Sequence, residues 1–262
     1  MDSGMSNLIA FLLSDASMHL HKLPNGKIRS RISLRVTDEN FAKYFQQIVK
    51  NVFSKEVKIK KRSAQKDNWS EIFEISFIVP KEKEEELRKI SETFRTKPFA
   101  NGNATNAAIP SEIFSASVDA RKSFLRIFAS AEGSVILAID KQRKWWSINR
   151  WISISCKHSK IHYQLLELLK TLGIEARSKW PEIIIKGKEN LENFRDKIGF
   201  LKGCKVTNKS NSKWRGFEKN SLLGLSIDLY EIDKTLIQKF KTKDDVFVWL
   251  KTCVRGDMPS ET

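Results

Sequence analysis

The chain has 262 residues, 40% of them hydrophobic, which is enough for one large domain or two small ones with a sizeable core. Its 47 Lys and Arg outnumber its 31 Asp and Glu, and the net charge of +16 indicates a polyanionic partner: nucleic acid first, an anionic membrane surface second. No segment approaches the roughly 18 consecutive apolar residues of a membrane span, and the start of the sequence does not read as a secretory signal. We therefore expect an intracellular protein, of the cytoplasm or an organelle matrix.

The chain begins with a helix, a hairpin, a helix, a second hairpin and a third helix. The first helical run, LIAFLLSDAS, ends at an acid, Asp15, and the hairpin after it turns at Asn-Gly. The predicted elements are a helix within 8–17, strands over 17–22 and 27–36, a helix over 38–53, strands over 55–63 and 69–79, and a helix over 81–94.

The same order returns after a segment that is rich in Asn and Ala. The run FLRIFASAEGSV also ends at an acid, Glu132, and Ile32 and Ser33 correspond to Ile152 and Ser153 at an offset of 120. The second set of predicted elements is a helix ending at Glu132, strands over 134–140 and 145–155, a helix over 157–173, strands over 174–180 and 182–187, and a helix over 188–199. The sequence therefore predicts a first unit over 1–99, a linker over 100–118, a second unit over 119–204 and an extension over 205–262.

The extension matches neither unit. Residues 205–224 read as a loop, and residues 233–254 read as one or two helices, either a buttress for the second unit or a source of further DNA contacts.

The three cysteines, Cys156, Cys204 and Cys253, are scattered and odd in number, which favours free thiols over a disulfide framework. Cys156 lies near His158 and His162, but a structural zinc site needs four ligands. The sequence therefore favours ordinary core or surface roles for these side chains.

The two acid-ending helices resemble the motif of the LAGLIDADG homing endonucleases in their single-chain, two-repeat form. The second copy, LRIFASAEG (125–133), matches that motif in its acid and final glycine but has Ile127 where a small residue is usual. The first copy, LIAFLLSDA (8–16), keeps the acid but has Ala16 where glycine is usual. Over residues 5–200, the resemblance implies an α+β fold of two pseudo-symmetric αββαββα units, with a saddle of antiparallel sheets around paired central helices. The small residues it implies for helix packing are Ala10, Ser14, Ala131 and Gly133.

The resemblance also implies that Asp15 and Glu132 are catalytic and bind Mg²⁺ or another divalent cation. Carboxylates suit such hard cations, and divalent metals assist phosphodiester hydrolysis. An acid at a helix C-terminus opposes the helix dipole, so two of them at equivalent places indicate a function. Arg35 and Lys157 are candidates for the basic residue that such sites often use at their periphery.

Basic and polar side chains alternate along the predicted strands, on the face opposite the apolar residues. Arginine reads guanine in the major groove, other basic groups neutralise phosphates, and a β-ribbon fits that groove. The predicted DNA-binding residues are His19, His21, Arg29, Arg31, Ser33, Arg35, Lys58, Lys60, Arg62, Asn149, Trp151, Ser153, Arg177 and Lys179.

These observations predict a monomeric intron-homing endonuclease that makes a staggered cut in a long, asymmetric DNA duplex. The alternative is a non-cleaving nucleic-acid-binding protein on the same scaffold, either a maturase for intron RNA or a DNA-binding regulator. A membrane-surface protein is disfavoured, because the basic residues lie on strands and not along one amphipathic helix.

Overall fold

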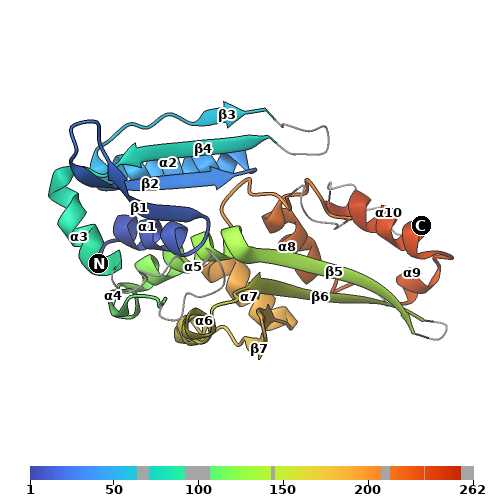
Figure 1. Ribbon diagram of the computed structural model, residues 1–262. Coiled ribbons are helices and arrows are strands. Elements are labelled where there is room, and N and C mark those ends of the chain that lie inside the picture. Colours follow the sequence, from blue (N-terminus) through green and yellow to red (C-terminus); the bar gives the residue numbers. More distant parts are fainter. Residues whose placement is uncertain (64–70, 92–106, 143–144, 208–212, 233, 255–262) are drawn as a thin grey trace.

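The computed structural model describes residues 1–63, 71–91, 107–142, 145–207, 213–232 and 234–254 (Figure 1). The first unit consists of α1 (Ser3–Leu13), β1 (Ala16–Lys22), β2 (Ile28–Val36), α2 (Glu39–Phe53), β3 (Lys60–Arg62), β4 (Ile72–Ile78) and α3 (Lys81–Ser91). The second consists of α5 (Val118–Glu132), β5 (Gly133–Gln142), β6 (Trp145–Ser155), α6 (Ser159–Thr171), β7 (Arg177–Lys179), β8 (Glu182–Ile185) and α7 (Lys188–Lys197). The predicted αββαββα order is confirmed in both units.

Each unit contains one antiparallel sheet of four strands. The strand orders are β1-β2-β4-β3 and β5-β6-β8-β7, so the two sheets have the same topology. The strand registers also correspond, because Ala16 pairs with Leu34 and Gly133 pairs with Ile154, which lies 120 positions after Leu34. The predicted α+β fold with two pseudo-symmetric sheets is therefore confirmed.

Helices α1 and α5 lie side by side between the two sheets (Figure 1). The hydroxyl of Ser6 donates to the carbonyl of Ala120 across the helix pair at 3.0 Å. Ala10 is completely buried, which allows close approach of the helices, whereas Phe11 packs against α2 with its ring 4.7 Å from that of Phe41. The core thus runs without a break from one unit into the other.

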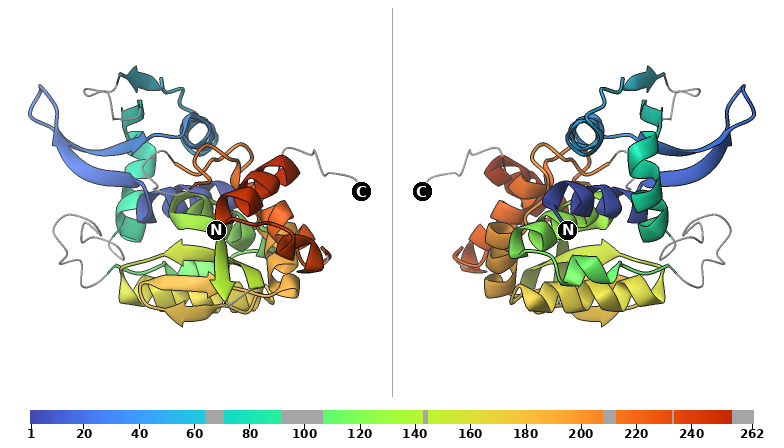
Figure 2. Two further views of the ribbon diagram at one scale, coloured as in Figure 1. Left: turned by 90° about the vertical axis from the view of Figure 1, so that its right-hand side faces the viewer. Right: turned by 90° about the vertical axis from the view of Figure 1, so that its left-hand side faces the viewer.

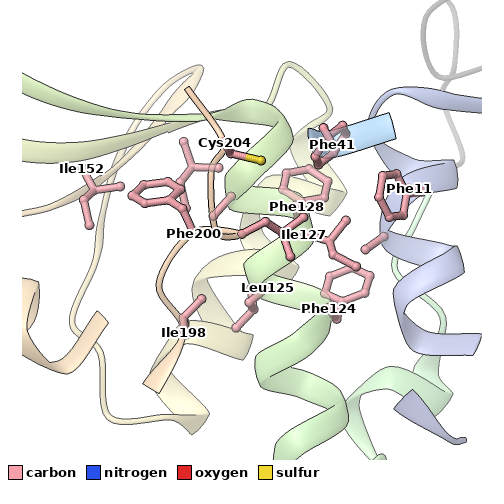
Figure 3. Packing of buried hydrophobic residues seen from close by; sticks show 14 of the residues in the cluster. Phe11, Phe41, Phe124, Leu125, Ile127, Phe128, Ile152, Ile198, Phe200 and Cys204 are labelled. Atoms are coloured by element: carbon pink, nitrogen blue, oxygen red, sulfur yellow. The ribbon is translucent and has the colours of Figure 1, made fainter. Parts of the chain in front are cut away.

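Ile127 belongs to this core. It is 3% exposed and lies on α5 with Phe124 and Phe128, on the side toward Phe11 of α1 (Figure 3). A large aliphatic side chain is therefore accommodated where the family motif has a small one, because it fills space among aromatic rings.

The C-terminal extension packs against the second unit. Its helices are α8 (Lys219–Asp228), α9 (Lys234–Gln238) and α10 (Lys243–Val254), so the interpretation of 205–224 as a loop is wrong for residues 219–224. The Gln238 side chain accepts from the Trp146 amide at 2.7 Å and donates to the Trp146 carbonyl at 2.8 Å, while the Trp214 indole donates to the Leu137 carbonyl. These contacts buttress the long β5–β6 hairpin, on the side of the molecule away from the β1–β2 hairpin (Figure 2).

The structure describes only part of the predicted linker and not all of the predicted element ends. A short helix, α4 (Ser111–Phe114), lies within the predicted linker, while residues 100–106 of that linker and the predicted element ends at 69–70 and 92–94 lie outside the described residues. Across the described ranges, no helix combines the length and the apolar character needed to cross a bilayer.

Candidate active site and nucleic-acid interface

The two acids follow the central helices in different ways. Helix α5 continues through Glu132, whereas α1 ends at Leu13 and leaves Asp15 in an exposed turn. The central helices pack against each other, and the charge of Asp15 acts on Glu132, so both acids lie in one region at the ends of α1 and α5.

The longer helix α5 explains the glycine after Glu132. A Cβ on Gly133 would lie 2.4 Å from the Ala129 carbonyl oxygen, which is closer than real Cβ atoms come to any heavy atom. The equivalent Ala16 is 6% exposed and fits in the core, because α1 has already ended when the chain reaches it. The substitution of alanine in the first motif is thus compatible with the helix pair.

The acids influence each other's charge. Burial, together with the negative charge of Asp15, raises the pKa of Glu132 to about 7, and the positive charge of Lys219 opposes this rise. A cation placed beside the two acids would stabilise the ionised form of Glu132.

Lys219, the first residue of α8, supplies one positive charge from within the protein. Its side chain is almost completely buried, and its ammonium donates to the carbonyls of Ser130 at 2.7 Å and Gly133 at 2.6 Å. Burial lowers the pKa of Lys219, while the negative charges of Asp15 and Glu132 oppose the change. Sequence analysis did not find this residue, because it is one of several lysines in a segment that reads as a loop.

A cavity of about 310 Å³ opens beside Asp15. Its lining includes Arg35, Asp38, Ser130 and Lys219, so the first unit, helix α5 and the extension all contribute to it. Of the two candidates for a peripheral basic residue, Arg35 lies at this cavity and pairs with Glu74 at 3.0 Å. Lys157 is exposed, just beyond the end of β6.

The strand registers place the predicted first-unit residues on one face of the sheet, opposite the core. His19 pairs with Arg31 and His21 with Arg29 across β1 and β2, and cross-strand partners share a face. Arg35 and Lys60 both pair with Glu74, which places them on that face too. Ser33 and Arg62 complete this face, and Lys58 is exposed just before β3.

The first-unit arginines differ in what holds them. Arg29 donates to Glu84 of α3 at 2.6 Å and to the Val79 carbonyl at 2.7 Å, so its guanidinium is engaged within the protein. Arg35 and Arg62 share the carboxylate of Glu74, at 3.0 and 2.7 Å.

Arg31 has no ion-pair partner among the described residues, and its buried Nε lacks a hydrogen-bond partner there. Among the four outward arginines of the first unit, it is the one without an ion pair to a described residue.

The registers also group the second-unit residues on one face. Ser153 pairs with Ile184, which pairs in turn with Arg177, and Lys179 lies two positions further along β7. Trp151 and Asn149 follow at alternate positions of β6, and the Asn149 amide donates to Asp140 at 2.7 Å.

An open groove adjoins Arg177 and Lys179. It has a volume of about 970 Å³, and Lys170 of α6 and Lys186 beyond β8 also line it. Sequence analysis did not select these two lysines: Lys170 lies on a predicted helix, and Lys186 lies near the end of the predicted strand over 182–187, from which no DNA-binding residue was chosen.

Residues 119–199 match the family described as LAGLIDADG-like domain. The second unit is a LAGLIDADG-like domain. No curated protein matches the chain by sequence. Two solved structures share its fold at 11% identity. A double mutant of I-SmaMI has a TM-score of 0.55 over 100% of both chains, and the LAGLIDADG meganuclease I-AabMI bound to uncleaved DNA has a TM-score of 0.51 over 99% of this chain and 100% of that one. The resemblance to the LAGLIDADG family is confirmed, and the matched segment lies within the predicted second unit.

In this LAGLIDADG-like domain the cysteine and histidine cluster has no metal-site geometry. The His158 side chain accepts from the Ile161 amide and caps α6, and His162 is buried with its Nε2 2.8 Å from the Ser178 hydroxyl. Within the described part of the chain, no group of three or more His, Cys, Asp or Glu is arranged to hold a metal ion.

Proposed function

We propose that the chain is a site-specific DNA endonuclease that makes a staggered double-strand cut in a long, asymmetric duplex by divalent-metal-dependent hydrolysis. The observation that carries the proposal is the electrostatic interaction of Asp15 with Glu132 at the ends of the paired helices, in a fold whose two sheets carry basic residues on their outward faces. The DNA-bound state of I-AabMI, which shares this fold, supports duplex DNA as the partner.

The donor set fits a magnesium-type cation. Mg²⁺ usually binds one or two carboxylates and completes its shell with water and substrate phosphates, so the pair of Asp15 and Glu132 suffices on the protein side. Burial, and after it the negative charge of Asp15, raises the pKa of Glu132, and a cation beside the two acids would favour their ionised forms. When bound, a divalent cation supplies a polarised water and stabilises the departing phosphodiester oxygen.

The residues of the chain carry out the remaining tasks in this proposal. Asp15 and Glu132 would hold the divalent cation, and each acid would serve one strand of the duplex. The outward side chains of the two sheets fix the register of the DNA, with Arg31 available to read a base and Lys179 to neutralise a phosphate. The first sheet presents histidines and arginines, where the second presents Asn149, Trp151 and Ser153, so the two halves of the target differ.

A randomised duplex library tests the proposal. The purified protein should select a recurring long site in Ca²⁺, and in Mg²⁺ it should cut both strands of that site with a fixed stagger. Selection of a site without any cutting in Mg²⁺ would contradict the endonuclease proposal.

One observation favours the second candidate, a non-cleaving nucleic-acid-binding protein that acts as an intron maturase or a DNA regulator. The buried ammonium of Lys219 opposes the charge of the acids, so their negative charge is partly compensated without any metal. If structured RNA is tested beside the duplex library, this candidate predicts binding to duplex DNA or to the RNA, and no cleavage of either.

A further inference from the structure

Two large aromatic side chains are exposed together at the edge of the second unit, where α6 contacts β7 on the side away from the first sheet (Figure 1). Tyr163 of α6 is 61% exposed, and Trp180, just beyond β7, is 55% exposed. Their ring centroids lie 5.6 and 5.4 Å from that of His162, which is completely buried. Both rings thus adjoin one buried ring and present apolar surface to solvent.

The aromatic pair lies on the α6 side of β7 and not on the outward face of the sheet. His162 Nε2 is 2.8 Å from the hydroxyl of Ser178, which pairs with the core residue Ile183. Neighbouring strand residues point to opposite faces, so Arg177 and Lys179 belong to the outward face. The pair is therefore additional to the sheet surface proposed to bind duplex DNA.

The open groove beside Arg177 and Lys179 continues from the aromatic pair. Leu166 and Glu167 follow Tyr163 by three and four positions, so the three share one side of α6, and Leu166 and Glu167 line the groove. Lys179, which precedes Trp180 in the chain, lines it too. The two rings thus lie at one end of the groove.

The charge of this groove is positive. Its basic residues outnumber its acidic ones, with Lys170, Arg177, Lys179 and Lys186 against Glu167 and Glu175. All four basic side chains belong to exposed residues, and none of them forms an ion pair with a described residue. Their charges are therefore available to an anionic partner.

We propose that Tyr163, Trp180 and the basic groove together bind a single-stranded segment of nucleic acid. Unpaired bases stack on aromatic side chains, while a positively charged groove follows the phosphate backbone. The bases of a duplex are already stacked on one another, so a duplex does not offer them to the two rings. Single-stranded RNA and single-stranded DNA both have this chemistry. The proposal goes beyond the proposed function and does not depend on cleavage.

Titration of the purified full-length chain with labelled single strands of about 12 nucleotides, one of RNA and one of DNA, tests the proposal. Trp180→Leu and Tyr163→Leu keep an apolar side chain and remove the ring, so each should weaken binding about tenfold. Trp180→Phe and Tyr163→Phe keep a ring and should retain most of the affinity. The strand type that binds more tightly identifies the source of the single strand.

Salt dependence tests the groove separately from the rings. For the double variant Lys170→Met/Lys186→Met, the slope of log affinity against log salt concentration should be shallower by about 1.4, since each lost phosphate contact removes about 0.7. Lys202→Met, at an exposed lysine outside the groove, is the matched control and should leave the slope unchanged.

Equal affinities of the wild type and both leucine variants would overturn the proposal, and a protein partner at this surface predicts that result. Equal losses in Trp180→Leu and Trp180→Phe would overturn it too, because stacking would not explain them. If Trp180→Leu does not fold, Tyr163→Leu decides, since the Tyr163 side chain is mostly exposed. Cleavage plays no part in these titrations, so a failure of the endonuclease proposal is distinguishable from a failure of this one.

Discussion

At the residue scale, the two acids occupy different environments. Asp15 lies in an exposed turn, whereas Glu132 is half-buried at the end of a helix whose dipole disfavours negative charge. Burial and the charge of Asp15 together raise the pKa of Glu132 to about 7, far above its usual 4.5. Glu132 is therefore destabilising when it is ionised and metal is absent.

This environment predicts a pH-dependent effect of Glu132→Gln on stability. The folded protein binds this proton more tightly than the unfolded chain, so the wild type loses stability as pH rises from about 4.5 to about 7. The loss reaches about 3 kcal/mol above that window. Chemical denaturation without metal should therefore find Glu132→Gln more stable than the wild type at pH 8, with the difference vanishing near pH 4.5.

An exposed acid serves as the control. Glu167→Gln, on the outer face of α6, should show no such pH-dependent difference. A constant difference between Glu132→Gln and the wild type from pH 4.5 to pH 8 would show that Glu132 ionises as an ordinary acid.

Two arginines on the same strand should respond in opposite ways to truncation. Arg29 holds the buried Glu84, whose pKa falls to about 2 because hydrogen bonds from Ser30 and Arg29 outweigh the effect of burial. Arg29→Ala should therefore destabilise the fold by about 1–3 kcal/mol. Arg31→Ala should leave stability nearly unchanged and weaken DNA binding by about 1–3 kcal/mol.

Denaturation curves and duplex titrations at fixed salt measure both effects. The assignment of Arg31 to the DNA surface is refuted if its truncation lowers stability and leaves binding unchanged.

At the element scale, the central helices have the same role but different ends. Helix α5 runs two residues further than the equivalent position in α1, which ends at Leu13, and this brings the Ala129 carbonyl against Gly133. Two motif positions that look equivalent in the sequence therefore face different steric demands.

This difference predicts unequal outcomes for a reciprocal pair of substitutions. Gly133→Ala should destabilise the protein by about 1–3 kcal/mol, because its methyl group overlaps the Ala129 carbonyl. Ala16→Gly, at the equivalent position, should cost about 1 kcal/mol or less, since it removes one methyl group and adds chain flexibility. Denaturant titration of both variants checks the order, and a larger loss for Ala16→Gly would refute this account of the helix ends.

Periodicity alone predicted most elements and the outward faces of both sheets. The alternation around Arg31 and Ser33 predicts a strand face that the register confirms, and the offset of 120 predicts the matching strand in the second unit. The burial of Glu84 was not predictable, because KEKEEELRK reads as a solvated helix and its contact with Arg29 is made across 55 residues. Lys219 was missed because its segment reads as a loop and only the folded chain brings α8 to the end of α5.

At the scale of the whole molecule, two units with one topology present different surfaces. The first outward face carries its arginines and histidines on β1 and β2, while the second carries a tryptophan and an asparagine on β6 and has an adjoining basic groove at β7. The extension supports the second unit's hairpin and adds Lys219 to the centre. We therefore expect an asymmetric target and unequal cutting of its two strands.

The central claim is that Asp15 and Glu132 together form the cutting centre, and strand-resolved cleavage of the selected duplex tests it most directly. With Mg²⁺, the wild type should cut both strands, whereas Asp15→Asn and Glu132→Gln should each slow the cutting of one or both strands by about two orders of magnitude. Binding of the same duplex in Ca²⁺ should persist in both variants. Unchanged cutting in both variants, or a wild type that binds the duplex and never cuts it, would contradict the account.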